Sequence, residues 1–234
     1  MKNNIYKIFI LLLFFLSSVN VENVKAVEPF NFDVTEVQIL ENGNKFIGIK
    51  KGTVTSDNGV IIDANEFEYD KITNILNASG DVKVNDIVNN NIIYTEKIIY
   101  DKNKEIIYTK EKSKGISLSD NVEIIAKDFE YNIPKNIIIA KGNVTIENQI
   151  EDYKIFSKLI TYYKNEEKFI TEDKTSGIIH SKYNFDSKNV TFLKNSMELF
   201  SNEKTIITDK YNLYNLSRFK YLINEEELRG EKIL

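Results

Sequence analysis

Residues 62–70 read Ile-Asp-Ala-Asn-Glu-Phe-Glu-Tyr-Asp, and residues 124–132 read Ile-Ile-Ala-Lys-Asp-Phe-Glu-Tyr-Asn, so that Phe67 corresponds to Phe129. The similarity continues without insertion or deletion to Val84 in the first copy and to Ile146 in the second. A half-period is also visible, because tyrosines recur at equal intervals, at Tyr69, Tyr100, Tyr131 and Tyr162. Repetition at such intervals is typical of proteins built by stacking similar structural units.

Within each copy, apolar and polar residues alternate, as they do in a β-strand with one buried face. Leu76 and Val82 fall on the apolar face, whereas Lys83 falls on the polar one. The alternation slips by one position at Asn65-Glu66 and again at Lys127-Asp128, which predicts a β-bulge or corner at both places. A kink at the same place in each copy predicts stacked strands that bend around a common interior.

Short strand-like segments fill the chain after Ala26, and turn compositions separate them. Residues 35–40 and 45–55 flank Asn42-Gly43 and predict a hairpin. Gly80 and Gly142 are interpreted as strand corners where a side chain would not fit. Past Gly177 the spacing contracts, and segments 183–186 and 211–215 are interpreted as degenerate copies.

Residues 1–26 have the composition of a secretory signal peptide. Lys2 and Lys7 precede an apolar run at residues 8–16, and Val24-Lys25-Ala26 offers small residues for cleavage. The run is too short to span a membrane comfortably, although an uncleaved anchor is the alternative. We therefore expect a signal peptide at residues 1–26 and one exported domain at residues 27–234.

Composition argues against several classes of function. The net charge is −4, and removal of the signal segment makes it more negative, so nucleic acid is not an expected partner. The chain has no cysteine and one histidine, His180, which removes the usual ligands of zinc and the parts of a catalytic triad. Glu66, Glu68 and Glu130 alternate with aromatic residues and should face solvent. We expect no catalytic residues, no metal and no cofactor.

The repeated pattern Ala-x-x-Phe-x-Tyr-[Asp/Asn]-x-x-x-Asn-Ile-x-x-Ala-x-Gly-[Asn/Asp]-Val-x-[Ile/Val] occupies residues 64–84 and 126–146. It resembles the OstA-like family, which comprises the lipopolysaccharide-transport proteins LptA and the N-terminal periplasmic domain of LptD. The resemblance covers roughly residues 33–232. It implies an all-β fold, a folded-over antiparallel β-jellyroll with an apolar slit, located in the periplasm of a Gram-negative bacterium.

The resemblance also implies the partners and the site. The partners would be the lipid A acyl chains of lipopolysaccharide and other Lpt proteins, docked edge to edge by strand addition, with self-association by the same edges. The slit would be lined by the apolar face of the repeats. The alternative is a closed, dry core of the same residues: Ile62, Ala64, Phe67, Tyr69, Leu76, Val82, Val84, Ile98, Tyr100, Ile107, Ile124, Ala126, Phe129, Tyr131, Ile138, Val144, Ile146, Ile160, Tyr162 and Phe169.

Three further interpretations stay open at this point. A strand-like ending at residues 229–234 favours an LptD-type N-terminal domain, continuing into a C-terminal β-barrel of the outer membrane, over a stand-alone LptA-type bridge. Barrel-bearing members often have cysteines that tie this domain to the barrel, and here there are none. A structural or adhesive β-solenoid with a closed core is the main alternative, and a carbohydrate-active enzyme is a third.

Overall fold

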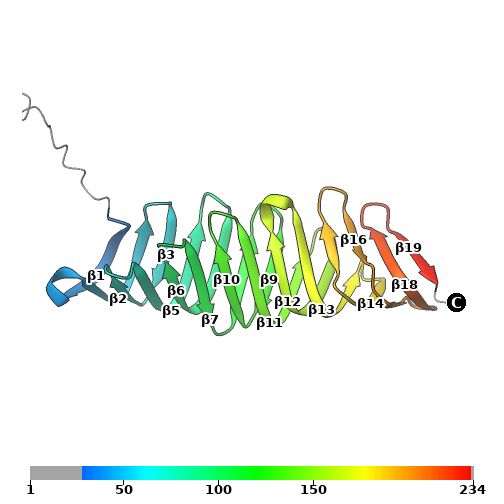
Figure 1. Ribbon diagram of the computed structural model, residues 1–234, viewed down its shortest axis with the longest axis horizontal. Helices are drawn as coiled ribbons and strands as arrows, with labels where there is room; N and C mark the ends of the chain where they lie inside the picture. The colour runs from blue at the N-terminus through cyan, green and yellow to red at the C-terminus, as the bar shows by residue number, and fades with distance from the viewer. Residues whose placement is uncertain (1–27, 233–234) are drawn as a thin grey trace, which may run out of the picture.

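The computed structural model describes residues 28–232, which form a single sheet of 19 strands (Figure 1). The predicted signal peptide lies outside the described residues. Two short 3-10 turns, η1 (Glu41–Gly43) and η2 (Lys164–Glu166), interrupt the strands. The strands are β1 (Phe30–Leu40), β2 (Lys45–Ser56), β3 (Val60–Ala64), β4 (Glu66–Asp70), β5 (Ile75–Asp86), β6 (Asn91–Asp101), β7 (Ile106–Lys110), β8 (Ser113–Ser117), β9 (Val122–Ala126), β10 (Asp128–Asn132), β11 (Ile137–Asn148), β12 (Tyr153–Tyr163), β13 (Lys168–Ile179), β14 (Tyr183–Lys188), β15 (Thr191–Leu193), β16 (Glu198–Ser201), β17 (Thr205–Thr208), β18 (Leu213–Leu222) and β19 (Glu227–Lys232).

The sheet is an antiparallel meander in which several long strands are split in two. β3 and β4 lie end to end, because they pair with successive halves of β2 on one side and of β5 on the other. The pairs β7/β8, β9/β10, β14/β15 and β16/β17 are arranged in the same way. One interval between periodic tyrosines is therefore a hairpin of two long strands, and the full sequence repeat is two such hairpins.

Each long strand bends near its middle, and the bends line up as a crease. Asn65 and Lys127 separate β3 from β4 and β9 from β10. The facing residues on β5 and β11 are Gly80 and Gly142, whose φ angles are 78° and 80°. A Cβ atom on Gly80 would lie 2.7 Å from Asn65 Nδ2, so a larger residue does not fit there. The predicted kinks and the interpretation of both glycines as corners are confirmed.

Buried hydroxyl groups satisfy backbone groups where the sheet bends. The amide of Phe129 donates to Thr109 Oγ1 at 2.7 Å, and the amide of Val190 donates to Thr171 Oγ1 at 2.8 Å. Both amides lie beside strand breaks, where the ladder of backbone hydrogen bonds is interrupted. Threonine at these two positions therefore stabilises the bend.

The crease divides the sheet into two wings that face each other. We define the first wing by β4, β7, β10, β15 and β16, and the second wing by β3, β8, β9, β14 and β17, each with the halves of the long strands that pair with them. The inner faces of both wings contribute to one apolar core. Figure 1 shows the strands stacked along the long axis of the molecule, with β1 and β19 at opposite ends.

The predicted all-β class and folded-over antiparallel architecture are confirmed. Among residues 28–232 every pairing between strands is antiparallel, which excludes a parallel β-helix, the form that the β-solenoid alternative would take. Within residues 28–232, no helix is long and apolar enough to cross a membrane.

Candidate functional site

All the residues that the sequence placed in an apolar slit lie in the core between the wings. None of their side chains is more than 4% exposed, from Ile62 in β3 to Phe169 in β13. The repeats bring them together because each bent strand adds the same apolar positions to the same face of the sheet. In this structure their side chains fill the space between the wings, and their contact with lipid stays a prediction.

Opposite the crease, the turns of the two wings meet along a line that we call the mouth. Three of the four periodic tyrosines reach across it from the first wing. Asn58 Nδ2 donates to the Tyr100 hydroxyl at 3.0 Å, and the Tyr131 and Tyr162 hydroxyls donate to Asp86 Oδ2 at 2.6 Å and to Asp120 Oδ2 at 2.7 Å. These tyrosines have their rings in the core and their hydroxyls in polar contacts that join the wings.

Around Tyr131 the mouth is held by a buried network. Asn91 Nδ2 of the second wing donates to the Tyr131 hydroxyl at 3.0 Å and to Asn136 Oδ1 of the first wing at 2.9 Å. Lys164 Nζ crosses from the first wing to Asn91 Oδ1 at 2.9 Å and also binds the carbonyl oxygen of Asn89. Burial lowers the pKa of Lys164 and outweighs the opposite effect of the charges on Asp120 and Asp86, and burial raises the pKa of Tyr131.

Asp120 is the centre of a second network. Besides Tyr162, it accepts a hydrogen bond from Ser117 Oγ at 2.6 Å and pairs with Lys194 Nζ of the first wing at 2.5 Å. Burial alone would disfavour the carboxylate, but the hydrogen bonds from Lys194, Ser117 and Tyr162 outweigh it and lower the pKa of Asp120 to about 2. The carboxylate therefore stays ionised and holds two groups of the opposite wing.

The same type of contact continues toward both ends of the mouth. Near β1, Lys102 Nζ of the first wing lies 2.7 Å from Asp57 of the second. Near β18, His180 Nδ1 and the Tyr221 hydroxyl are 2.7 Å apart across the mouth. Burial raises the pKa of Tyr221 to about 12. Polar contacts thus join the wings from Lys102 to Tyr221.

Tyr69 differs from the other periodic tyrosines. Its hydroxyl donates to Asn74 Oδ1, 2.8 Å away in the same wing. Its ring contacts Phe30, with 4.9 Å between the ring centroids, and Phe30 also contacts Tyr100. Aromatic packing therefore replaces the polar bridge at this end.

A small cavity interrupts the mouth beside Asp120. Its lining includes Glu151, Tyr153 and Lys194. Glu151 Oε2 and the Tyr153 hydroxyl are buried there and have no hydrogen-bond partner among residues 28–232, and burial raises the pKa of Glu151. Buried polar atoms without partners cost free energy. The hydrogen-bonding groups of the mouth are therefore less well satisfied at this cavity than in the networks around Tyr131 and Asp120.

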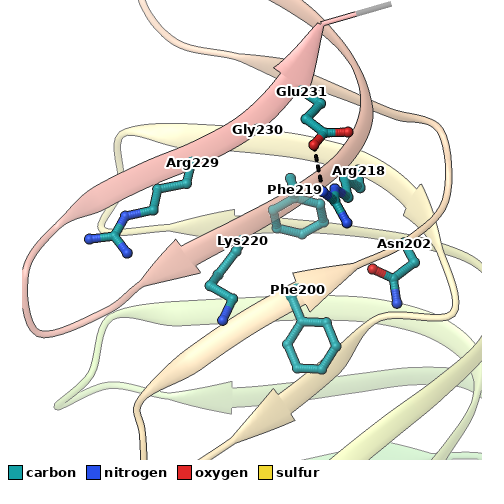
Figure 2. A pocket seen from close by; sticks show the side chains of 8 residues that line it. All are labelled: Phe200, Asn202, Arg218, Phe219, Lys220, Arg229, Gly230 and Glu231. Atoms are coloured by element: carbon teal, nitrogen blue, oxygen red, sulfur yellow. Dashed lines mark hydrogen bonds and ion pairs between the residues drawn. The ribbon is translucent and has the colours of Figure 1, made fainter.

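A pocket of about 380 Å³ lies on the surface near the C-terminal end, between β16, β18 and β19 (Figure 2). Arg218, Lys220 and Arg229 surround it. Each pairs with a carboxylate, with Arg218 Nη2 2.5 Å from Glu231, Lys220 3.0 Å from Glu198 and Arg229 2.8 Å from Glu227. Because these charges cancel, the pocket offers no clear site for an anion.

The acidic residues of the repeats form no site. Glu66 and Glu68 are exposed, and Glu130 is half-buried in an ion pair with Lys141, so the prediction that they lie on the polar face is confirmed. Among residues 28–232, no group of three or more His, Cys, Asp or Glu residues is arranged to hold a metal ion.

Sequence reasoning missed the polar partners across the mouth. Three of the residues that contact the first wing, Asn58, Asn89 and Asp120, share the spacing of the periodic tyrosines, as does Glu151 in the cavity lining, and this second period was the available signal. The interpretation of segments 183–186 and 211–215 as copies of the tyrosine unit was wrong. Tyr183 begins β14 in the second wing, and Tyr211 is 81% exposed in a turn, whereas Tyr221 occupies the equivalent position.

Comparison with known proteins finds a likeness in solved structures. No protein-family model matches the chain, and no curated protein sequence matches it. A similar solved structure is the crystal structure of LptH, the LptA homologous periplasmic component of the conserved lipopolysaccharide transport device from Pseudomonas aeruginosa. It is 12% identical, with a TM-score of 0.42 over 49% of this chain and 83% of that chain. A likeness at this level assigns no function.

Proposed function

We propose that this chain is a non-enzymatic periplasmic carrier that shields the acyl chains of lipopolysaccharide between its two wings. The observation that supports this most is the continuous apolar core. The core runs along the stack between the two wings, which are joined covalently through the crease. The resemblance of residues 64–84 and 126–146 to the OstA-like pattern supports the same conclusion.

The energetics of acyl chains explain why such a carrier needs an apolar interior. Burying an alkyl chain is worth about 0.8 kcal/mol per methylene, so a chain of a dozen carbons gains about 10 kcal/mol when it leaves water. To admit an acyl chain, the core side chains of the two wings would have to move apart. The acyl chain would then replace the contacts between those side chains.

The sheet edges support end-to-end docking. Within the described residues, β1 pairs with β2 alone and β19 with β18 alone, which leaves an unpaired edge at each end of the stack. An unpaired edge can accept a strand from another protein. We propose that other Lpt proteins, or further copies of this chain, dock at these edges.

The more specific form of the proposal is an LptD-type N-terminal domain, with a stand-alone LptA-type bridge as the alternative. Immunoblotting of the native protein in fractionated cells distinguishes them. A bridge would migrate at the mass of this chain in the periplasmic fraction, whereas a domain of a larger protein would migrate at a greater mass with the outer membrane.

Native mass spectrometry of the mature chain, which we expect to begin at Val27, tests the proposal directly. The chain is mixed with lipopolysaccharide, with lipid A, or with a polysaccharide as control. A stoichiometric adduct with the two lipids alone is the expected result. A folded monomer that forms no lipid adduct would contradict the proposal.

Photo-crosslinking tests the site itself. A photo-reactive residue at Phe129 or Ile138, both buried between the wings, should label lipopolysaccharide in cells. The same residue at Glu68, which is exposed on the outer face, is the matched control and should label much less. Equal labelling at inner and outer positions would argue against an interior site.

A structural scaffold with a permanently closed core is the second candidate. It is favoured by the filled core and by the polar contacts that hold the mouth. This candidate predicts that folded protein takes up no lipid even on prolonged incubation, and the adduct experiment therefore separates the two.

A further inference from the structure

Two different kinds of connection join the wings. Along the crease they are joined covalently, because every long strand passes through it. Along the mouth, side chains join them, from Lys102 and Asp57 at one end to His180 and Tyr221 at the other. Within the described residues, none of the backbone hydrogen bonds in turns and loops crosses the mouth, and the strand ladders stay within a wing or continue through the crease.

We propose that the contacts across the mouth form a releasable clasp, and that lipid passes sideways between the turns of the two wings when the clasp opens. The inference rests on the proposed function, because it names the route and the control of uptake at the same core. It predicts that uptake does not depend on the open ends of the stack.

The chemistry of the clasp suits repeated opening. Its members are hydroxyl, amide, ammonium and carboxylate groups at the surface end of the core, and water can replace each of these partners when the wings part. Opening hinges on the crease, where Gly80 and Gly142 already adopt left-handed backbone conformations. The hydrogen-bonded ladders inside each wing are kept, so each wing can move as a unit.

The strongest part of the clasp is central. Asp86 and Asp120 each bind a tyrosine hydroxyl of the opposite wing, at 2.6 and 2.7 Å, and Lys164 and Lys194 reinforce the two networks. Hydrogen bonds with a charged partner are stronger than neutral ones. Tyr131 and Tyr162 are therefore the hydroxyls whose removal should loosen the mouth most.

The first experiment measures opening without lipid. The natural chain has no cysteine, so Val122→Cys, in the cavity lining beneath the clasp, gives a single reactive thiol. We expect the double variant Tyr131→Phe with Tyr162→Phe to raise the maleimide labelling rate of this thiol about tenfold. Tyr69→Phe is the matched control, since its hydroxyl bonds within one wing, and it should change the rate less than about twofold.

A second reporter separates opening of the mouth from unfolding. Ala140→Cys is also buried but lies next to the bend in β11. Global unfolding would raise the labelling of both reporters, whereas opening of the mouth raises that of Val122→Cys alone. Equal labelling rates in the double variant and the Tyr69→Phe control would overturn the proposed clasp. A similar rise in the labelling rates of Val122→Cys and Ala140→Cys would also overturn it.

The second experiment locks the mouth. Cysteines replace Asp57 and Lys102, and also Asp120 and Lys194, and a reducible bis-maleimide bridges each pair. The locked full chain should bind lipopolysaccharide vesicles at least about tenfold more weakly than the same variant before cross-linking, and reduction should restore binding. Undiminished binding by the locked protein would overturn the sideways route while leaving the proposed function intact. Failure of the unmodified chain to bind lipid would overturn the proposed function, and the labelling comparison would still decide whether the clasp opens.

Discussion

Single residues in this fold serve the core and its boundary at the same time. Tyr131 shows this most clearly, because its ring is fully buried while its hydroxyl donates to Asp86. Burial and the neighbouring Asp86 raise its pKa, so the hydroxyl stays protonated and available as a donor. A phenylalanine would fill the same space without joining the wings. Tyrosine at this position is thus explained by geometry rather than by hydrophobicity alone.

The corner glycines give a prediction at this scale. Gly80→Ala should lower the free energy of unfolding by about 1 kcal/mol or more, because it combines a left-handed backbone with a Cβ 2.7 Å from Asn65 Nδ2. Gly43→Ala is the control, since its φ is 92° and no heavy atom lies within 4 Å of the added Cβ. Urea unfolding measures both. If both variants lose a similar amount of unfolding free energy, backbone strain alone, and not the close approach at the crease, determines the loss of stability.

Asp120 predicts how stability depends on pH. Its pKa is about 2 in the folded chain and about 3.9 in an unfolded one, so its ionised form stabilises the fold fully above pH of about 4. This contribution is lost as the pH falls from about 4 to about 2. Urea unfolding at several pH values should show a flatter profile for Asp120→Asn across this window. An unchanged profile would show that the ion pair with Lys194 does not stabilise the folded state.

At the scale of strands, the ends of the stack differ from its middle. Ile39 of β1 lies opposite Phe46, whose ring packs against Tyr69 in the core. Cross-strand partners point to the same face, so Ile39 points to the core side, yet it is 60% exposed. Val37 is on the same face and is 42% exposed. Considering residues 28–232, the first-wing half of β1 therefore presents both an unpaired edge and an uncovered apolar face.

This end should mediate self-association. Ile39→Lys places a charge on the uncovered face and should shift the chain toward monomer in sedimentation velocity experiments, because a lysine there opposes apolar docking. Gln38→Lys adds the same charge to the other face of the same strand and is the control. If both variants associate like the natural chain, docking does not use this end of the stack.

As a whole, the molecule is close to one-dimensional. Each long strand pairs with its neighbours along the chain, so the sheet grows by one hairpin for each interval between periodic tyrosines, along the axis seen in Figure 1. In such stacks, stability arises from each unit and its contacts with adjacent units. In the part of the chain that the structure describes, the first and last hairpins pair with a neighbouring hairpin on one side only.

Hydrogen exchange should reveal this gradient. We expect amides of β5 to β12 to exchange most slowly, and those of β1 and β19 to exchange fastest, because local opening begins where neighbours are missing. Mass spectrometry of exchanged peptides measures it. Uniform protection along the stack would show that the chain unfolds as one cooperative unit, and would contradict a gradual loss from the ends.

Local sequence patterns specify the strands, their inner faces and their bends. Strict alternation identifies the buried face of a strand, a slip in that alternation marks a corner, and the long repeat makes both recur. The kinks at Asn65 and Lys127 and the inward-facing residues of the repeats could therefore be predicted, whereas core residues outside that set, such as Phe185 and Tyr221, were not. These features depend on local chemistry and on parity along one chain.

How the two wings face each other, and which side chains join them across the mouth, is visible only in the folded chain. The hydrogen bonds that join Tyr131 to Asp86 and Tyr162 to Asp120 link residues far apart in the chain, and the regular spacing of the tyrosines does not show which carboxylates they meet. Nothing in the sequence indicates that His180 meets Tyr221, and only the fold brings the two side chains together. The reason is that the angle of the crease, which sets every contact across the mouth, results from packing of the whole core and not from any one segment.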